Sequence, residues 1–250
     1  MNKQVHLAIQ YLATAGKSFL APKDDDSHTN IGYVPGKRIV QTWPFDAIGT
    51  GLAFDFTDFS LKWIGSKTVS FNLDGKTHEE IVMWITKMAE ASRLEKKYRY
   101  HLHYTLPYSI DANFRFGLTD QKALDKMAEL RTLSQDVLRV FLQEESLESD
   151  IRIWPHHFDT GAFVELADGS GKSFGIGMAI PDSVVDHHYF YFSAYLGHDS
   201  IDTSNFKELS RGEWRNTGFM GAVLSAYKVR KEEGVQFLRE AFNTYFGTTV

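Results

Sequence analysis

Two hydrophobic periods, one typical of strands and one typical of helices, are the feature of this 250-residue chain that most restricts its fold. Strand-like segments of four to nine residues, bounded by turn residues, occur in two groups. They are residues 38–42, 52–56, 61–64 and 69–73, followed by 98–106, 151–155, 162–166, 174–180, 189–195 and 219–226. Hairpin turns at 55–60 and 65–67 join members of the first group, which predicts an antiparallel meander.

Helical patterns flank both groups of strands. The first is amphipathic, with one face formed by Val5, Ala8, Ile9, Leu12, Ala15 and Phe19. Thr77 and Glu80 form a capping box that opens a second helix, a long pattern spans residues 119–141, and a last one begins near Glu232. The order helix, strands, helix thus appears twice. We expect an α+β fold of antiparallel sheets flanked by helices, with an N-terminal half at 1–96 and a C-terminal half at 97–250 that are two repeats or one continuous domain.

Composition and charge exclude several classes of protein. The chain has no cysteine, so disulfides and thiolate metal sites are ruled out. A net charge of −5, with no basic run longer than residues 93–99, argues against a nucleic-acid partner. No segment reaches the roughly 18 apolar residues of a membrane span. His6 and Gln10 interrupt the first apolar stretch, unlike a signal peptide, so we expect a cytoplasmic protein without a membrane partner.

No nucleotide-binding motif is complete. Residues 169–173 (Gly-Ser-Gly-Lys-Ser) resemble the end of a P-loop, but Leu166 occupies the place of the loop's first glycine and a strand-like segment follows instead of a helix. The residues at 49–51 and 175–177 lack the third glycine of a dinucleotide fingerprint. The sequence therefore indicates no nucleotide cofactor.

Paired histidines suggest a metal centre. His156 or His157, Asp159, and His187 or His188 could supply two imidazoles and a carboxylate. Such a set suits zinc, iron or manganese and leaves a position open for water, which a hydrolytic enzyme would activate. If both histidine pairs lie on strands, neighbouring rings point to opposite faces, and each pair offers one ligand.

The strand at 189–195 divides into two faces. Its core face consists of Phe190, Phe192, Ala194 and Leu196, and its polar-aromatic face carries His187, Tyr189, Tyr191, Ser193 and Tyr195. On the neighbouring strand, the same alternation leaves Ser173, Gly175, Gly177 and Ala179 beside these tyrosines. A row of small residues next to tyrosines predicts either a ligand groove or a face on which another layer packs closely.

Two further sets of residues are candidates for ligand binding. Glu165 lies on a strand that we expect to be enclosed, where a carboxylate needs a partner or has a raised pKa. The other set, Trp214 and Arg215, lies in an expected turn at 211–216 and combines an indole with a guanidinium group. Such a pair could hold a polar or anionic ligand. For Glu165 the alternatives are an ion pair with Arg152 or an edge position in water, and for Trp214 and Arg215 the alternative is an ordinary surface turn.

Short aromatic motifs occur in order along the chain: Phe54-Asp55-Phe56-Thr57-Asp58, then residues 154–159 (Trp-Pro-His-His-Phe-Asp), 189–195 and 221–227 (Gly-Ala-Val-Leu-Ser-Ala-Tyr). Together they resemble a bacterial family catalogued only as a domain of unknown function. That family carries a Trp-Gly-Ser-Phe-Asp-like run where this chain has its histidine pair. The resemblance implies a bacterial cytoplasmic protein, and it implies no activity or cofactor.

These observations favour a small-molecule-binding protein whose ligand lies on the polar-aromatic face of the C-terminal half. The first alternative is a metal-dependent hydrolytic enzyme that uses the His and Asp ligands above. The second is a self-associating protein, in which an exposed stripe of Tyr189, Tyr191 and Tyr195 forms a homodimer surface.

Overall fold

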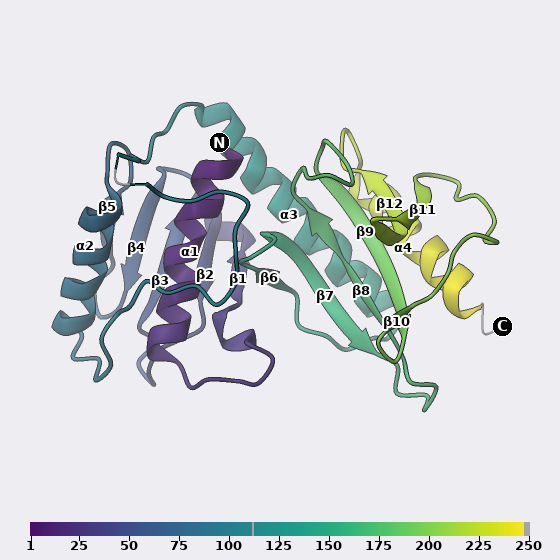
Figure 1. Ribbon diagram of the computed structural model, residues 1–250, viewed down its shortest axis with the longest axis horizontal. Helices are drawn as coiled ribbons and strands as arrows, with labels where there is room; N and C mark the ends of the chain where they lie inside the picture. The colour runs from purple at the N-terminus through teal and green to yellow at the C-terminus, as the bar shows by residue number, and fades with distance from the viewer. Residues whose placement is uncertain (112, 248–250) are drawn as a thin grey trace. The chain divides into compact units, whose positions relative to one another are not determined.

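The computed structural model describes residues 1–111 and 113–247, which form two compact units (Figure 1). The N-terminal unit consists of Met1–Glu129 and Ile153–Phe158, and the C-terminal unit of Leu130–Arg152 and Asp159–Val250. Residues 97–129, assigned to the C-terminal half by sequence, therefore group with the N-terminal unit. Each unit is an antiparallel sheet flanked by helices, as predicted.

The N-terminal unit is built on a sheet with the strand order β6-β1-β2-β3-β4-β5. Its elements are α1 (Asn2–Phe19), the 3₁₀ helices η1 (Ser27–Thr29) and η2 (Pro35–Lys37), β1 (Ile31–Val34), β2 (Ile39–Thr42), β3 (Gly51–Asp55), β4 (Ser60–Ile64), β5 (Val69–Asn72), α2 (His78–Ala91) and β6 (Arg152–Trp154). The meander β2–β5 confirms the first group of predicted strands. Sequence reasoning missed β1, because four residues that include Gly32 are too few to display a period.

Helix α2 begins at the predicted capping box. The Thr77 hydroxyl accepts a hydrogen bond from the Glu80 amide, and the Glu80 carboxylate accepts one from the Thr77 amide. Ile81 and Ile85 are buried, and Trp84 stacks on Phe71 with ring centroids 5.0 Å apart. Ile81, Trp84 and Ile85 therefore lie on the face by which α2 packs.

Helix α1 is buried on its predicted apolar face and also on the opposite face, which the sequence did not predict. Residues 5–16 are all buried, including the polar His6, Gln10 and Thr14. The sheet lies on one side of α1, and the irregular segment at residues 98–108 crosses its other side (Figure 1). The second layer comes from residues about 90 positions away, so the local period could not reveal it.

The prediction of a strand at 98–106 is wrong, although its alternation is present. The segment forms no ladder, because it covers a helix instead of a neighbouring strand. Tyr98 and Tyr104 face α1, where their hydroxyls bond Thr14 at 2.8 Å and Gln10 at 2.6 Å. Alternation therefore identifies which side chains face inward, and it does not identify the backbone's partner.

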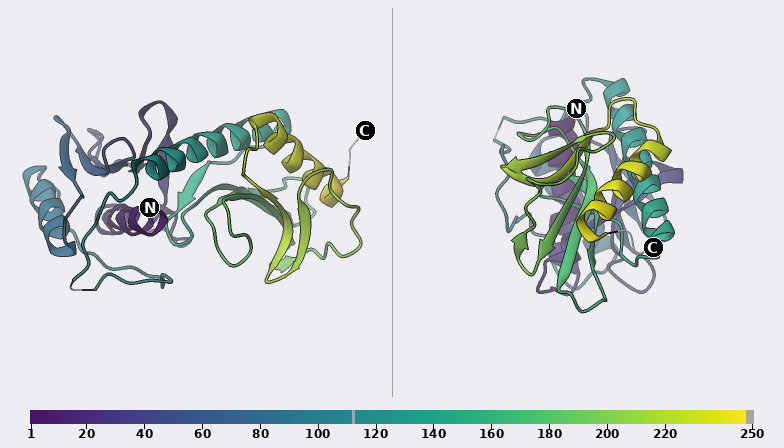
Figure 2. Two further views of the ribbon diagram at one scale, coloured as in Figure 1. Left: turned by 90° about the horizontal axis from the view of Figure 1, so that it is seen from above. Right: turned by 90° about the vertical axis from the view of Figure 1, so that its right-hand side faces the viewer.

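The C-terminal unit contains β7 (Asp159–Glu165), β8 (Lys172–Ala179), β9 (Tyr189–Leu196), β10 (Asp199–Ser200), β11 (Glu213–Thr217), β12 (Phe219–Ser225) and α4 (Lys231–Phe246). Helix α3 (Gln121–Glu144) begins in the N-terminal unit and ends here. The strand order is β7-β8-β9-β12-β11, with β10 beside β9. Helix α4 and the last part of α3 cover one face of this sheet (Figure 2).

Aromatic residues fill the core under these helices. Phe174 of β8 stacks on Phe192 of β9 with centroids 4.9 Å apart, and Phe141 of α3 meets both rings edge-on. The predicted core face of β9 is confirmed at Phe190, Phe192 and Ala194, whereas Leu196, the last residue of the strand, is 54% exposed. Within the described ranges, no helix has both the length and the hydrophobicity that crossing a bilayer requires.

The close approach of α1 to η1 generates a prediction. A Cβ atom at Gly16 would lie 2.6 Å from the carbonyl oxygen of His28. Alanine ordinarily stabilises a helix by about 1 kcal/mol relative to glycine. Here overpacking against backbone outweighs that gain, so Gly16→Ala should lower the free energy of unfolding by about 1–2 kcal/mol in urea titrations.

Gly36→Ala is the matched control, since nothing lies within 4 Å of its added Cβ. We expect the control to change stability by less than about 0.5 kcal/mol. A Gly16→Ala protein as stable as the wild type would contradict the packing described for α1.

Candidate functional site

The outer face of the C-terminal sheet, opposite the helices, carries the predicted polar-aromatic residues. Strand register places Phe163, Gly175 and Ser193 in one row, and Glu165, Ser173 and Tyr195 in the next. Because side chains alternate along each strand, these residues all project away from the core. The face predicted from the sequence of β8 and β9 therefore extends onto β7.

Tyr191 fills the part of this face that was expected to be bare. A Cβ at Gly177 would lie only 2.6 Å from the Tyr191 hydroxyl oxygen, so the ring lies directly over β8. From there the hydroxyl donates a hydrogen bond to the buried Asp159 carboxylate on β7, at 2.5 Å. A ring of the neighbouring strand, and not a separate layer, therefore fills the space over Gly177. Burial and the Asp159 charge raise the pKa of Tyr191 well above its usual value.

The other tyrosines of β9 are also engaged. Tyr189 is only 4% exposed, and its hydroxyl bonds Asp182 at 2.8 Å. Its pKa is raised, first by burial and then by Asp182. Tyr195 is half-buried and donates to Ser193 at 3.1 Å. Tyr189 is thus not part of an exposed stripe, and the homodimer stays a prediction without that residue.

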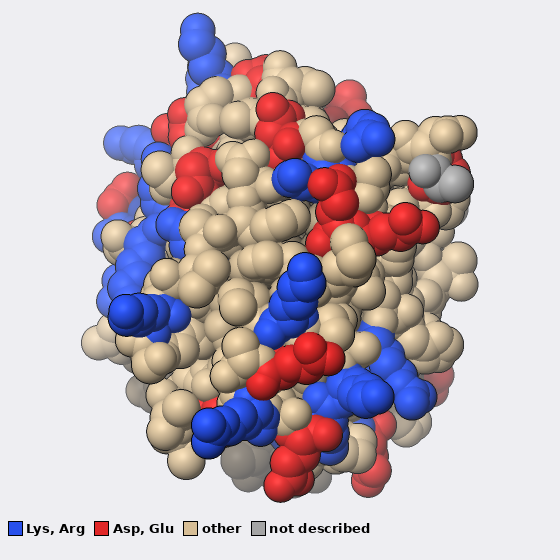
Figure 3. Space-filling model, turned by 90° about the vertical axis from the view of Figure 1, so that its left-hand side faces the viewer, with Lys and Arg blue, Asp and Glu red and all other residues tan. Residues whose placement is uncertain are grey.

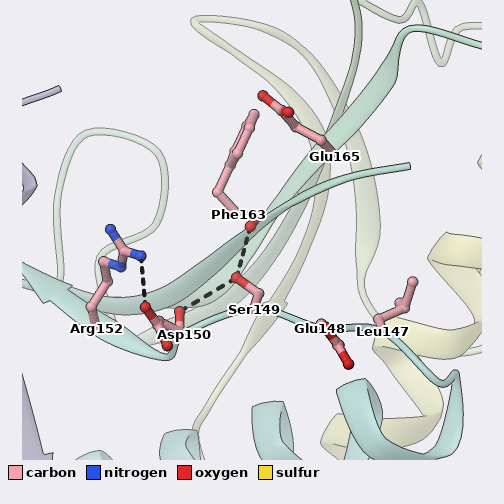
Figure 4. Close-up of a pocket in the computed structure, with 7 residues that line it drawn as sticks. All are labelled: Leu147, Glu148, Ser149, Asp150, Arg152, Phe163 and Glu165. Atoms are coloured by element: carbon pink, nitrogen blue, oxygen red, sulfur yellow. Dashed lines mark hydrogen bonds and ion pairs between the residues drawn. The ribbon is translucent and has the colours of Figure 1, made fainter. Parts of the chain in front are cut away.

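An open hollow of about 740 Å³ adjoins β7 (Figure 4). Phe163 and Glu165 project into it from β7, and Arg152, Asp150 and Ser149 lie on the neighbouring segment. We call it the Phe163 hollow; its lining is Leu147, Glu148, Ser149, Asp150, Arg152, Phe163 and Glu165. Phe163 is 47% exposed. Aromatic, acidic and basic groups therefore meet in one accessible place.

The floor of the hollow is held by its own hydrogen bonds. Ser149 donates to the carbonyl oxygen of Phe163 at 2.7 Å, and Arg152 pairs with Asp150 at 3.2 Å. Glu165 is exposed, which corrects the expectation of an enclosed carboxylate. The reason is alternation: Ala162 and Val164 take the core face, so Glu165 faces solvent.

His156 and His157 lie in a turn, so the condition under which their rings would point to opposite faces of a strand is not met. The backbone reverses after β6, with Phe158 in the left-handed region at φ 57°. The two rings consequently lie side by side, with centroids 4.3 Å apart. Burial lowers the pKa of His156 to about 4, assisted by the charges of His157 and His103.

The structure does not gather the proposed metal ligands into a cluster. His187 lies in a bend before β9, where its exposed ring is 3.6 Å from Asp186, and Asp159 is engaged by Tyr191. Among residues 1–111 and 113–247, no group of three or more His, Asp or Glu side chains is placed to hold a metal ion. The metal centre stays a prediction, which analysis of the purified protein can test.

Trp214 and Arg215 belong to strand β11, not to the expected turn. As consecutive strand residues they point to opposite faces. The Trp214 indole packs on Tyr245 and donates to the carbonyl oxygen of Lys207 at 2.9 Å, whereas Arg215 pairs with Glu213 at the surface. The two side chains therefore do not form one ligand grip.

Sequence reasoning named Glu165 as a ligand-binding candidate, and it missed Phe163, Glu148 and Asp150. Alternation along 162–166 was a usable signal, because it places Phe163 and Glu165 on one face opposite Ala162 and Val164. No local pattern could add Ser149 and Asp150, which reach the hollow through tertiary structure.

The bond between Tyr191 and Asp159 leads to a second prediction. Tyr191→Phe keeps the ring over Gly177 and removes one donor to a buried carboxylate. We expect the free energy of unfolding to fall by about 1.5–3 kcal/mol in urea titrations. Tyr195→Phe, which loses a bond to a neutral hydroxyl, should have less than half that effect. Equal effects of the two substitutions would argue against a special role of the Tyr191–Asp159 pair.

Elemental analysis provides a third prediction. The metal-centre hypothesis expects near one equivalent of zinc, iron or manganese in protein purified without a chelator or a histidine tag, and expects that metal to be lost on His157→Ala. Less than about a tenth of an equivalent, persisting after incubation with these metals, would contradict the hypothesis.

Likeness to known proteins offers a separate route to function. Comparison of the chain with protein-family models, curated proteins and solved structures found no match.

Proposed function

We propose that the protein is a small-molecule-binding protein of the cytoplasm and that its ligand occupies the Phe163 hollow. The observation that carries the proposal is the exposed Phe163 ring, held among charged groups above an open cavity. Burying a phenylalanine side chain is worth about 1.5–3 kcal/mol, so a ring left half-exposed in a hollow is a ready contact for a ligand. Ser149 fixes the backbone beneath the ring, and this preorganisation lowers the cost of binding.

The charges of the hollow favour a small organic cation. Glu148, Asp150 and Glu165 contribute three carboxylates, whereas Arg152 contributes one guanidinium that already pairs with Asp150. The face of an aromatic ring attracts cations. An amine could therefore lie over Phe163 while its positive charge approaches Glu165.

The neighbouring outer face gives the ligand room to extend. The rings of Phe163 and Tyr195 lie 6.4 Å apart, and the β8 residues in their two rows of the sheet are the small Gly175 and Ser173. A ligand with an apolar body could contact both rings. The polar-aromatic groove is thus proposed at Phe163, Gly175 and Tyr195, next to the position that Tyr191 fills.

The test uses putrescine and choline as probes, with binding followed by saturation-transfer NMR. The wild type should bind at least one of them. Phe163→Ala and Glu165→Gln should each weaken that binding about tenfold, since each removes one attraction to the cation. Phe163→Leu, which keeps apolar contact without the π face, should be intermediate.

Tyr227→Ala is the control, because Tyr227 is an exposed aromatic residue of the same unit outside the hollow. It should bind as the wild type does, and circular dichroism should show that all variants are folded. Absence of wild-type binding at millimolar probe, or undiminished binding by Phe163→Ala, would refute the proposal. A shift from dimer to monomer on Phe163→Ala, with no probe bound, would instead favour self-association.

A further inference from the structure

A second hollow, of about 490 Å³, lies at the C-terminal end of α1 in the N-terminal unit. Its lining is Lys17, Ser18, Lys96, Lys97, Arg99 and His101. We call it the basic pocket. It contains four permanent cations, a histidine and a hydroxyl, and no carboxylate lines it.

The segment that covers α1, together with the end of this helix, forms the basic pocket. Tyr98 is buried against Thr14, so the chain's alternation turns its neighbours Lys97 and Arg99 outward. Ser18 anchors the same point twice: its hydroxyl accepts from the Arg99 amide at 2.9 Å and donates to the Arg99 carbonyl at 3.2 Å. The cations therefore project from backbone that is fixed to the helix end.

The four cations are not neutralised within the protein. Among the described residues, none of Lys17, Lys96, Lys97 and Arg99 forms an ion pair, and the nearby Asp26 pairs with His103 at 3.4 Å instead. Elsewhere on this unit opposite charges lie side by side, as over much of the face that carries α2 (Figure 3), where Lys76 pairs with Glu80. In a chain of net charge −5, an uncompensated cluster of this kind is unusual.

The end of α1 explains only part of the cluster. Lys96 donates to the carbonyl oxygen of Leu20, and Lys17 lies in the last turn, so both offset the negative end of the helix dipole. Lys97 and Arg99 touch no helix carbonyl in this way. Their charges are available to a ligand.

We propose that the basic pocket binds a small molecule through a phosphate group. A phosphate offers several oxygens and up to two negative charges, which match separate lysines and the two-pronged donor set of arginine. The cavity volume suits a small ligand. This inference is independent of the Phe163 hollow, which lies in the other unit.

The experiment is calorimetric titration of the full chain with pyrophosphate at low salt. The wild type should bind, and Lys97→Gln/Arg99→Gln should bind at least about tenfold more weakly, because two charged hydrogen-bond donors are lost. Arg99→Lys, which keeps the charge and loses the paired donors, should be intermediate. The ring resonances of His101 should shift on titration of the wild type.

Lys87→Gln/Lys122→Gln is the matched control, since it removes the same charge from exposed lysines of α2 and α3 that do not line the pocket. It should bind within about twofold of the wild type. Equal losses in both double variants, or no wild-type binding at millimolar pyrophosphate, would overturn the proposal. Binding of a single-stranded oligonucleotide without binding of pyrophosphate would also overturn it, in favour of a nucleic-acid surface.

Discussion

The enclosure of α1 is the constraint on which the N-terminal unit depends. A buried polar group without a partner costs about 1–3 kcal/mol, so the polar stripe His6, Gln10 and Thr14 requires specific neighbours. The stripe meets three tyrosine hydroxyls, from Tyr108, Tyr104 and Tyr98 respectively. The carbonyl oxygen of Pro155 also accepts from His6 at 2.7 Å and from Gln10 at 2.9 Å. These bonds hold residues 98–108 in place without a strand ladder. The outward side chains of Lys96, Lys97, Arg99 and His101, in and just before this segment, line the basic pocket.

The C-terminal unit depends on strand alternation instead. Aromatic residues on one face pack beneath α3 and α4, and the other face is left with tyrosines, glycines and the exposed Phe163. Tyr191 crosses the bare strand at Gly177 and is tied to Asp159. Tyr191 thereby covers the centre of this face, and the accessible hollow lies beside β7. Strand alternation, which directs Ala162 and Val164 into the core, therefore also exposes Phe163 and Glu165 together on the other face.

The sequence predicted features whose cause is local. The capping box of Thr77 and Glu80 and the two faces of β9 follow from spacing alone, and the structure confirms them. Features that depend on distant partners could not be predicted: the second layer over α1 and the turn that brings His156 beside His157. The exposure of Glu165, by contrast, follows from alternation along β7, a signal that the sequence contains. For the candidate site, alternation predicts the outer face on which the Phe163 hollow lies. Alternation could not show that Tyr191 covers Gly177, because the position of the Tyr191 side chain depends on its contacts with Gly177 of β8 and Asp159 of β7.

We propose above that the exposed ring of Phe163 contacts a small cationic ligand. It is tested most directly by placing 4-fluorophenylalanine at position 163 and following its ¹⁹F resonance during titration with putrescine or choline. We expect a saturable shift at position 163 and no shift for the same label in place of Tyr227. An unchanged resonance at position 163, or equal shifts at both positions, would contradict it.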